Sequence, residues 1–470
     1  MNLSYRWREF WLLGAVCGSI ACGEVPGTSD SITGESSGSS GGTTATSGPD
    51  TPTTVGPTSL PPTTSETDPT DATVTTATVT SATDSSATDT ATLTSVTTVS
   101  TVTSETETSD SDSDSETDTD GTTGPVQMFT PLALEVEDFD ADGQQDLLVL
   151  GVDNFDGTVA RLSRGVGDGT FMAAIDAGLH GASAFPVVGE LDDTPGVDVM
   201  MAQENNVVEV FRWTGATFES WKSFENTTLP RTHVIADGDG DDDDDIVWLW
   251  WDAKAVEFGV SLRPNGGGFF FAPVDTKVGV IAEFGLAPQS LMVGDIDGDG
   301  DGDALVWEAD KAKGFLRMFG SQQGLFGAAK FVAQGMRPWV AALGDFDEDG
   351  KLDIVAVERS PAKLVVALGD GKGAFAAGGG IDILAPFKPF TIAVADVDGD
   401  QHLDVVIVDD QTPELRIFPG NGDAGFLAPK PVALDSPSVR VHARALDAQL
   451  PLDLAVATFA AGDVTIVLNP

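Results

Sequence analysis

Acidic side chains recur at a fixed spacing in this chain. Residues 344–357 read GDFDEDGKLDIVAV, in which Asp345, Asp347, Asp349 and Asp353 occupy positions 1, 3, 5 and 9 of a short loop that precedes an apolar run. Four carboxylates on one tight turn can direct several oxygens at a common point. Calcium takes six to eight oxygen ligands at about 2.3–2.6 Å. The spacing therefore predicts a site for a hard divalent cation.

The loop occurs five times intact and twice in a degenerate form. The intact copies begin at Asp138, Asp237, Asp295, Asp345 and Asp396. The degenerate copies begin at Glu190 and Ala445 and have lost carboxylates from the middle of the loop. We expect weak binding at most in the first of these two and no ion in the second.

Two other interpretations compete with a repeated calcium hairpin. An EF-hand begins with the same spacing but requires a bidentate glutamate at position 12 and flanking helices. Position 12 is apolar in every intact copy, namely Val149, Trp248, Val306, Ala356 and Ile407. The second alternative is that the motifs are solvated acidic turns that bind no ion. Five copies with the same carboxylate spacing argue against this alternative.

The elements that must position these loops form repeats. The seven motifs start 47 to 58 residues apart, and a glycine-rich turn ending in phenylalanine recurs between them, as in GDGKGAF ending at Phe375. Each unit contains about four short apolar runs rich in β-branched and aromatic residues, with almost no helical periodicity. Four short strands in each of seven units predict an all-β, seven-bladed β-propeller with four-stranded blades over residues 128–470.

The two ends of the repeat region indicate how the ring closes. The seventh unit stops at VTIVLNP, before its outer strand, and residues 128–134 precede the first motif and resemble an outer strand. We therefore expect residues 128–134 to complete the last blade, which would remove the exposed sheet edges.

The motifs resemble the FG-GAP and VCBS repeats of integrin α-subunit propellers and of many bacterial surface proteins. In that family the motif is a calcium-binding hairpin loop between two strands of one blade. The resemblance implies about five calcium sites, with carboxylates at positions 1, 3, 5 and 9 and a backbone carbonyl at position 7. The implied ligands are Asp138, Asp140, Asp142, Gln144 and Asp146; Asp237, Asp239, Asp241, Asp243 and Asp245; Asp295, Asp297, Asp299, Asp301 and Asp303; Asp345, Asp347, Asp349, Lys351 and Asp353; and Asp396, Asp398, Asp400, His402 and Asp404.

The N-terminal region predicts export and a lipid anchor. Two arginines precede an apolar stretch from Phe10 to Ala21 that is too short for a permanent membrane helix. The residues SIAC resemble a bacterial lipobox, so residues 1–22 are interpreted as a lipoprotein signal peptide with Cys22 as the lipidation site. We expect the mature chain at the outer membrane or cell surface, attached to the membrane by lipid alone.

Residues 23–127 have the composition of a tether. They contain no lysine, arginine or aromatic residue and are dominated by threonine and serine, with a run of acidic residues near the end. Such a stretch lacks the apolar surface for a core, and its like charges repel one another. We predict a disordered acidic linker that holds the propeller away from the anchor.

Charge and motif content limit the function. The net charge of −50 excludes a partner bound through nucleic-acid phosphates. The chain has no G-x-S-x-G or H-E-x-x-H motif, and its four histidines are scattered among different units. We therefore expect no enzyme but a calcium-stabilised adhesion module of the cell envelope that recognises a protein or glycan. A propeller-based polysaccharide lyase or hydrolase and a purely structural surface protein are the alternatives.

The geometry of the repeat predicts where a ligand would bind. The calcium loops share one end of their strands, so the opposite rim is formed where the first strand of each unit begins and the second strand ends. Aromatic and arginine side chains at such positions are typical of binding surfaces. The candidate ligand-binding residues are Arg231, Gln289, Trp339, Phe390, Trp250, Trp251 and Arg359.

Overall fold

The computed structural model describes residues 95–100 and 129–468, apart from 154–157, 180–185, 193, 203–206, 226–228, 253, 281–287, 448, 450 and 459–462. The signal peptide, Cys22 and most of the predicted linker lie outside the described residues. All described residues belong to one compact unit.

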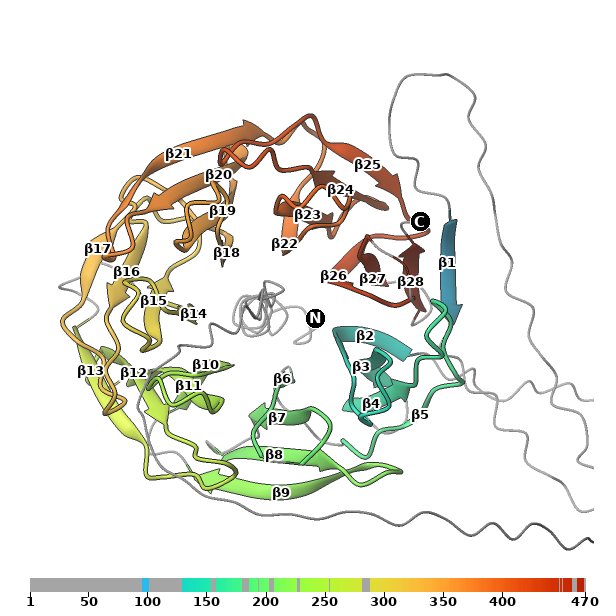
Figure 1. Cartoon of the computed structure of the whole chain (residues 1–470), viewed down its shortest axis with the longest axis horizontal. Helices are drawn as coiled ribbons and strands as arrows, with labels where there is room; N and C mark the ends of the chain where they lie inside the picture. Colours follow the sequence, from blue (N-terminus) through green and yellow to red (C-terminus); the bar gives the residue numbers. More distant parts are fainter. Residues whose placement is uncertain are drawn as a thin grey trace, which may run out of the picture. The chain divides into compact units, whose positions relative to one another are not determined.

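The described residues form seven four-stranded antiparallel sheets around a ring (Figure 1). Six sheets are simple meanders in which consecutive strands pair, as in the order β2, β3, β4, β5. The first strand of each sheet lies toward the centre of the ring and the last strand lies outside (Figure 1). The predicted seven-bladed propeller is confirmed, and the sheets are called blades 1 to 7 in chain order.

The bounds of the strands follow the predicted repeats. Blade 1 contains β2 (Phe129–Glu137), β3 (Asp146–Asp153), β4 (Thr158–Ser163) and β5 (Ile175–Asp176); blade 2 contains β6 (Val187–Gly189), β7 (Asp198–Ala202), β8 (Val207–Trp213) and β9 (Phe218–Glu225); blade 3 contains β10 (Leu229–Ala236), β11 (Asp245–Asp252), β12 (Glu257–Arg263) and β13 (Val274–Val280); blade 4 contains β14 (Ser290–Gly294), β15 (Asp303–Trp307), β16 (Phe315–Met318) and β17 (Lys330–Val332); blade 5 contains β18 (Val340–Gly344), β19 (Asp353–Arg359), β20 (Ala362–Gly369) and β21 (Phe375–Asp382); blade 6 contains β22 (Pro389–Ala395), β23 (Asp404–Asp409), β24 (Glu414–Phe418) and β25 (Lys430–Ala433); blade 7 contains β26 (Ser438–Arg444), β27 (Asp453–Thr458), β28 (Asp463–Leu468) and β1 (Ser95–Ser100).

The apolar run after each motif is the second strand of a blade. Every residue of β15, β23 and β27 is buried, because neighbouring blades cover both faces of these strands. A strand covered on both faces has a continuous apolar sequence, whereas a strand with one exposed face alternates apolar and polar residues. The outer strand β21 is mostly exposed and is correspondingly rich in glycine and alanine.

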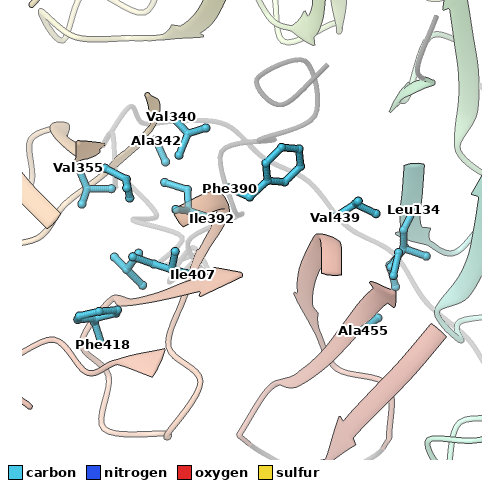
Figure 2. Close-up of a cluster of buried hydrophobic side chains, with 14 of the residues drawn as sticks. Leu134, Val340, Ala342, Val355, Phe390, Ile392, Ile407, Phe418, Val439 and Ala455 are labelled. Carbon is cyan, nitrogen blue, oxygen red and sulfur yellow. The ribbon is translucent and has the colours of Figure 1, made fainter. Parts of the chain in front are cut away.

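The blades are held together by side chains that pack across their interfaces. One cluster of buried side chains runs through blades 5, 6, 7 and 1 and includes Val340, Ile392, Val439 and Leu134 (Figure 2). Burial of one such aliphatic side chain stabilises the fold by about 1.5–3 kcal/mol. The stability of the ring therefore depends on contacts between blades as well as on pairing within them.

The ring closes through a strand that the sequence analysis did not identify. Residues 129–137 form β2, the innermost strand of blade 1, where Glu137 pairs with Asp146. The expectation that residues 128–134 complete the last blade is therefore wrong. The fourth strand of blade 7 is β1, which pairs antiparallel with β28 from Ser95 opposite Leu468 to Ser100 opposite Asp463.

The position of β1 changes the interpretation of the linker. It lies within residues 23–127, so the tether interpretation does not hold for these six residues. The threonines and valines of SVTTVS have high β propensity, and an existing edge at β28 supplies the pairing that an isolated segment lacks.

Charged contacts reinforce the junction between the last and first blades. From β26, Arg440 lies 3.3 Å from the Glu135 carboxylate and Arg444 lies 2.6 Å from that of Glu137. The Nε2 atom of His442 lies 2.8 Å from the carbonyl oxygen of Leu134. The inner strands of blades 7 and 1 are thus joined along their length.

Candidate calcium loops and binding rim

Each acidic motif is the loop between the first and second strands of its blade. In blade 5, β18 ends at Gly344 and β19 begins at Asp353, so the loop spans residues 345–352. The same register holds in all five intact copies. All five loops therefore lie on one face of the ring, as predicted.

The aspartate at position 1 shapes the turn. In blade 5 the two carboxylate oxygens of Asp345 accept hydrogen bonds from the amides of Asp349 and Gly350, at 3.0 and 2.9 Å. The equivalent residues of the other copies, Asp138, Asp237, Asp295 and Asp396, accept the same two amides. Position 1 therefore has a conformational role that does not depend on an ion.

Positions 4 and 6 of the loop have left-handed backbone conformations. Position 6 has φ between 68° and 92° in all five copies, including the non-glycine residues Asp242 and Gln401. Position 4 also has positive φ, as at Glu348 with 59°. Glycine occupies position 6 in three copies, so the sequence marks that position as left-handed. It does not mark position 4, because alanine and glutamate occupy that position in two copies.

The aspartate at position 9 joins three segments of its blade. In blade 5 the buried Asp353 accepts the amide of Phe346 at 3.0 Å and that of Gly369, at the end of β20, at 2.7 Å. The equivalents Asp146, Asp245, Asp303 and Asp404 make the same pair of bonds. This residue fastens the loop to the third strand.

Burial disfavours the charge on these position 9 carboxylates. Desolvation raises the pKa of Asp146, Asp245, Asp303 and Asp404 to about 7, and that of Asp353 to about 6. The neighbouring carboxylates of each loop add to this effect. A bound cation would oppose both causes and favour the ionised form.

The aspartate at position 3 has an oxygen without a partner. The Oδ1 atoms of Asp140, Asp239, Asp297, Asp347 and Asp398 are buried and have no hydrogen bond in the described part of the chain. Buried polar atoms are normally paired, and an unpaired one costs about 1–3 kcal/mol. The same atom is unpaired in all five loops, so each loop offers a cation an equivalent oxygen.

The carboxylates converge around that atom. Each intact loop has three carboxylate groups with one oxygen apiece within 4.8 Å of one another, drawn from positions 1, 3 and 9, or from 1, 3 and 5 in blade 4. An all-oxygen set of this kind suits calcium. The residues therefore fit the predicted ion, whereas the carbonyl role of Gln144, Asp243, Asp301, Lys351 and His402 at position 7 stays a prediction.

The degenerate loops retain the position 9 aspartate and its bond within the loop, without the cluster. Asp198 accepts the amide of Leu191 at 3.2 Å, and Asp453 accepts that of Leu446 at 3.1 Å. Within the described residues of blades 2 and 7, no three carboxylates come together as they do in the other five. Position 9 is thus a structural residue in all seven blades, and sequence reasoning that treated it as a ligand alone missed this role.

Contacts between adjacent loops were also missed by the sequence analysis. The position 7 side chain of His402 in blade 6 contacts Glu348, at position 4 of the blade 5 loop. Asp301 in blade 4 occupies the corresponding place beside Gly240 of blade 3, where an added Cβ would lie 2.6 Å from its Oδ1. These contacts depend on how blades are placed side by side, which the repeat spacing does not specify.

A pair of alanine substitutions separates the two roles. Asp347 makes no hydrogen bond within the described residues, so Asp347→Ala should remove only the calcium-dependent stability of one loop, about 0.4–1.4 kcal/mol at 1 mM calcium. Asp453→Ala should cost about 1–3 kcal/mol with or without calcium, because it leaves buried amides unpaired. Denaturant unfolding of both variants, with calcium and with chelator, measures this. Equal calcium dependence of the two variants would contradict the assignment.

The structure brings three of the seven candidate rim residues together. The guanidinium of Arg359 lies 4.1 Å from the ring centroid of Trp339, and the indole Nε1 of Trp339 donates to the carbonyl oxygen of Phe390 at 3.0 Å. These residues belong to blades 5 and 6, at the end of the strands opposite the aspartate loops.

The other candidates are separate from this group. Trp250 and Trp251 lie near the end of β11, and Gln289 precedes β14. Trp250 and Phe390 are only 7% and 6% exposed, so their side chains are part of the core and offer a ligand little surface. The backbone of Arg231 lies in β10, but its side chain lies outside the described residues.

A cavity of about 380 Å³ opens beside Arg359. It is lined by Asp310, Arg359, Ser360, Phe387, Lys388 and Pro389. These residues come from the end of the second strand or the start of the first strand in blades 4, 5 and 6, so the cavity lies on the rim opposite the aspartate loops. We call it the rim groove. Of its lining, Arg359 is one of the seven candidate ligand-binding residues.

Comparison with known families agrees with the loop geometry. The family described as FG-GAP-like repeat matches residues 295–356 and 345–407. The chain carries FG-GAP-like repeats. The two matched FG-GAP-like repeats begin at position 1 of the loops in blades 4 and 5. No curated protein sequence matches the chain significantly.

Solved structures of similar shape have low sequence identity to the chain. A lectin from Agrocybe aegerita that recognises non-reducing terminal N-acetylglucosamine is 20% identical, with a TM-score of 0.49 over 66% of this chain and 81% of the lectin. BBS1N in complex with ARL6DN is 12% identical, with a TM-score of 0.47 over 73% of this chain and 92% of that one. The rhamnogalacturonan lyase YesW is 13% identical, with a TM-score of 0.43 over 74% of this chain and 73% of the lyase.

Proposed function

We propose that this chain is a calcium-stabilised binding module that is exported and displayed on a cell surface. The observation that carries the calcium assignment is the unpaired, buried Oδ1 atom at position 3, which recurs in five loops beside two further carboxylates. With an ion bound, these oxygens gain a partner and the charge repulsion within each loop falls. Calcium then stabilises the propeller and takes no part in a reaction.

The rim groove supports a binding role. It lies on the rim opposite the five loops, and it combines aromatic, cationic and anionic side chains in a cavity of about 380 Å³. Cavities of roughly 300–1,000 Å³ with a few placed polar groups are typical of ligand sites. The proposed ligand is a protein or a glycan, and binding of either would make the module an adhesin.

The test is a pull-down and glycan array with the full chain carrying Cys22→Ser, which avoids lipidation and retains β1. We expect a specific ligand in calcium, and weaker capture after chelation because the blades that form the groove are less firmly held. Cleavage of a captured polysaccharide would favour the lyase or hydrolase alternative. Absence of any ligand, together with a calcium-dependent fold, would favour a structural surface protein.

The anchor proposal gives a prediction for Cys22. Within the described residues, no helix is long and apolar enough to cross a membrane. If a lipid on Cys22 is the attachment, Cys22→Ser should move the protein from the membrane fraction to the soluble fraction, whereas Cys17→Ser should leave it in place. Fractionation and mass spectrometry of the mature N-terminus measure this. A mature chain that begins elsewhere without lipid would contradict the proposal.

A further inference from the structure

Two cations of the rim groove have no carboxylate partner. Within the described residues, the guanidinium of Arg359 makes a cation–π contact with Trp339 but no hydrogen bond or ion pair, and the ammonium of Lys388 makes neither. The chain has 74 acidic residues and 24 lysines and arginines, so carboxylate partners are abundant elsewhere. The groove therefore presents two positive charges that its surroundings leave available.

The ring beneath Arg359 and the backbone of Lys388 are held in place by buried groups. Trp339, whose ring lies under Arg359, donates its indole N–H to the carbonyl oxygen of Phe390 at 3.0 Å and its backbone amide to that of Val357 at 2.7 Å. The backbone amide of Lys388 donates at 2.6 Å to Asp409, whose side chain is fully buried. The stacking of Arg359 on the fixed Trp339 ring reduces the side-chain entropy that this residue loses when a ligand binds.

The carboxylates around the groove are mostly engaged. Asp409 accepts the amides of Gln411 and Thr412 as well as that of Lys388. Glu358 accepts the amide of Arg337 at 2.8 Å. Asp310 also lines the groove and forms no ion pair with either cation, so its carboxylate is an acceptor that a ligand can use.

The lining defines the chemistry of a ligand. Arg359 and Lys388 suit a carboxylate, because charge-assisted hydrogen bonds to guanidinium and ammonium are strong. Asp310 and the exposed Ser360 suit hydroxyl groups, since a carboxylate accepts hydrogen bonds and a hydroxyl both donates and accepts. A molecule that carries one carboxylate and several hydroxyls on a small ring satisfies both sides of the groove.

We propose that the rim groove binds an acidic sugar, a uronate residue of a glycan. This inference rests on the proposed binding function and specifies its ligand class. The net charge of −50 opposes a polymer charged at every residue, so a uronate flanked by neutral sugars is preferred. An acidic peptide fits less well, because Asp310 would repel its second carboxylate.

Ligand-observed NMR with the full Cys22→Ser chain in calcium tests the proposal. The probes are the methyl glycosides of glucuronate and galacturonate, each matched with the neutral methyl glucoside or galactoside. We expect at least one uronate to bind and its neutral partner to bind at least about tenfold more weakly. Acetate should also be weak, since it lacks the hydroxyls.

Substitutions assign the binding to the groove. Arg359→Gln and Lys388→Gln should each weaken uronate binding about tenfold or more. The matched control is Lys363→Gln. Lys363 is a half-exposed residue of blade 5, like Arg359; its ammonium lies 3.6 Å from the Asp382 carboxylate, and it is outside the groove lining. Lys363→Gln should leave the affinity unchanged. Melting curves check that each variant is folded. If Arg359→Gln does not fold, Lys388→Gln still tests the proposal.

The outcomes separate this inference from the function on which it rests. Uronate binding that both glutamine variants retain, or no uronate binding, overturns the inference. Preference for acetate or for an acidic peptide overturns the ligand class. If the glycan array then shows a neutral glycan or a protein ligand, the binding function stands without the uronate assignment. If the array shows no ligand in calcium, the binding function itself fails.

Discussion

Removal of calcium should lower the melting temperature of the chain by several degrees. At 1 mM calcium and the dissociation constants of about 0.1–1 mM typical of extracellular modules, mass action contributes roughly 0.4–1.4 kcal/mol per site. Five independent loops then contribute about 2–7 kcal/mol, a large part of the stability of an ordinary domain. For a domain of this size the expected decrease is about 3–10 °C.

Calorimetry with calcium, with magnesium and with chelator measures this decrease. Magnesium is the matched control, because it requires near-ideal octahedral geometry and should restore less stability than calcium. A melting curve indifferent to calcium would falsify the metal assignment and leave the five clusters as solvated turns.

The effect of calcium also depends on pH in a defined direction. Burial raises the pKa of Asp146 from 3.8 to about 7, so between these values the metal-free folded chain binds a proton that the unfolded chain does not. Its stability therefore increases as pH falls from 8 towards 5. Calcium competes with these protons, so its own contribution decreases over the same range. The difference between the calcium and chelator melting curves should be largest near pH 8 and small near pH 5; a constant difference would contradict this.

Removal of β1 should destabilise the propeller, although β1 lies outside the repeats. A deletion of residues 23–94 should leave the melting temperature nearly unchanged, whereas a deletion of residues 23–100 should lower it. The second deletion removes six cross-strand residue pairs with β28, worth about 1–6 kcal/mol in total. It also exposes the β28 edge, so we expect concentration-dependent association of the shorter protein.

Proline substitutions test the same contact in the full chain. Replacing both Thr97 and Thr98 with proline removes two consecutive backbone N–H donors. One of the two faces β28, because alternate amides of an antiparallel strand point toward its partner. Replacing both Thr43 and Thr44 is the matched control within the same threonine-rich region. Equal melting temperatures for the two double variants would show that β1 does not close the ring.

The sequence by itself determined the architecture and the composition of the candidate metal loops. The period of the motif gave seven units, and the continuous apolar run after Asp353 and its equivalents marked the second strand, because that strand is covered on both faces. The spacing of carboxylates at positions 1, 3, 5 and 9 is a local property, since all ligands of a loop come from nine consecutive residues. Local properties of this kind are legible in the sequence.

Only the tertiary structure decided the features that join distant segments. The outer strand of blade 7 is β1, because SVTTVS pairs with a β28 edge more than 360 residues later, and no local pattern distinguishes it from the other threonine-rich stretches. Asp353 proved to fasten its loop to the third strand of the blade because its carboxylate accepts the backbone amide of Gly369. The rim groove brings Arg359 to Lys388 and Asp310 from three blades. Residues of different blades come together because the closed ring packs each blade against the next. The sequence of a single repeat does not specify that packing.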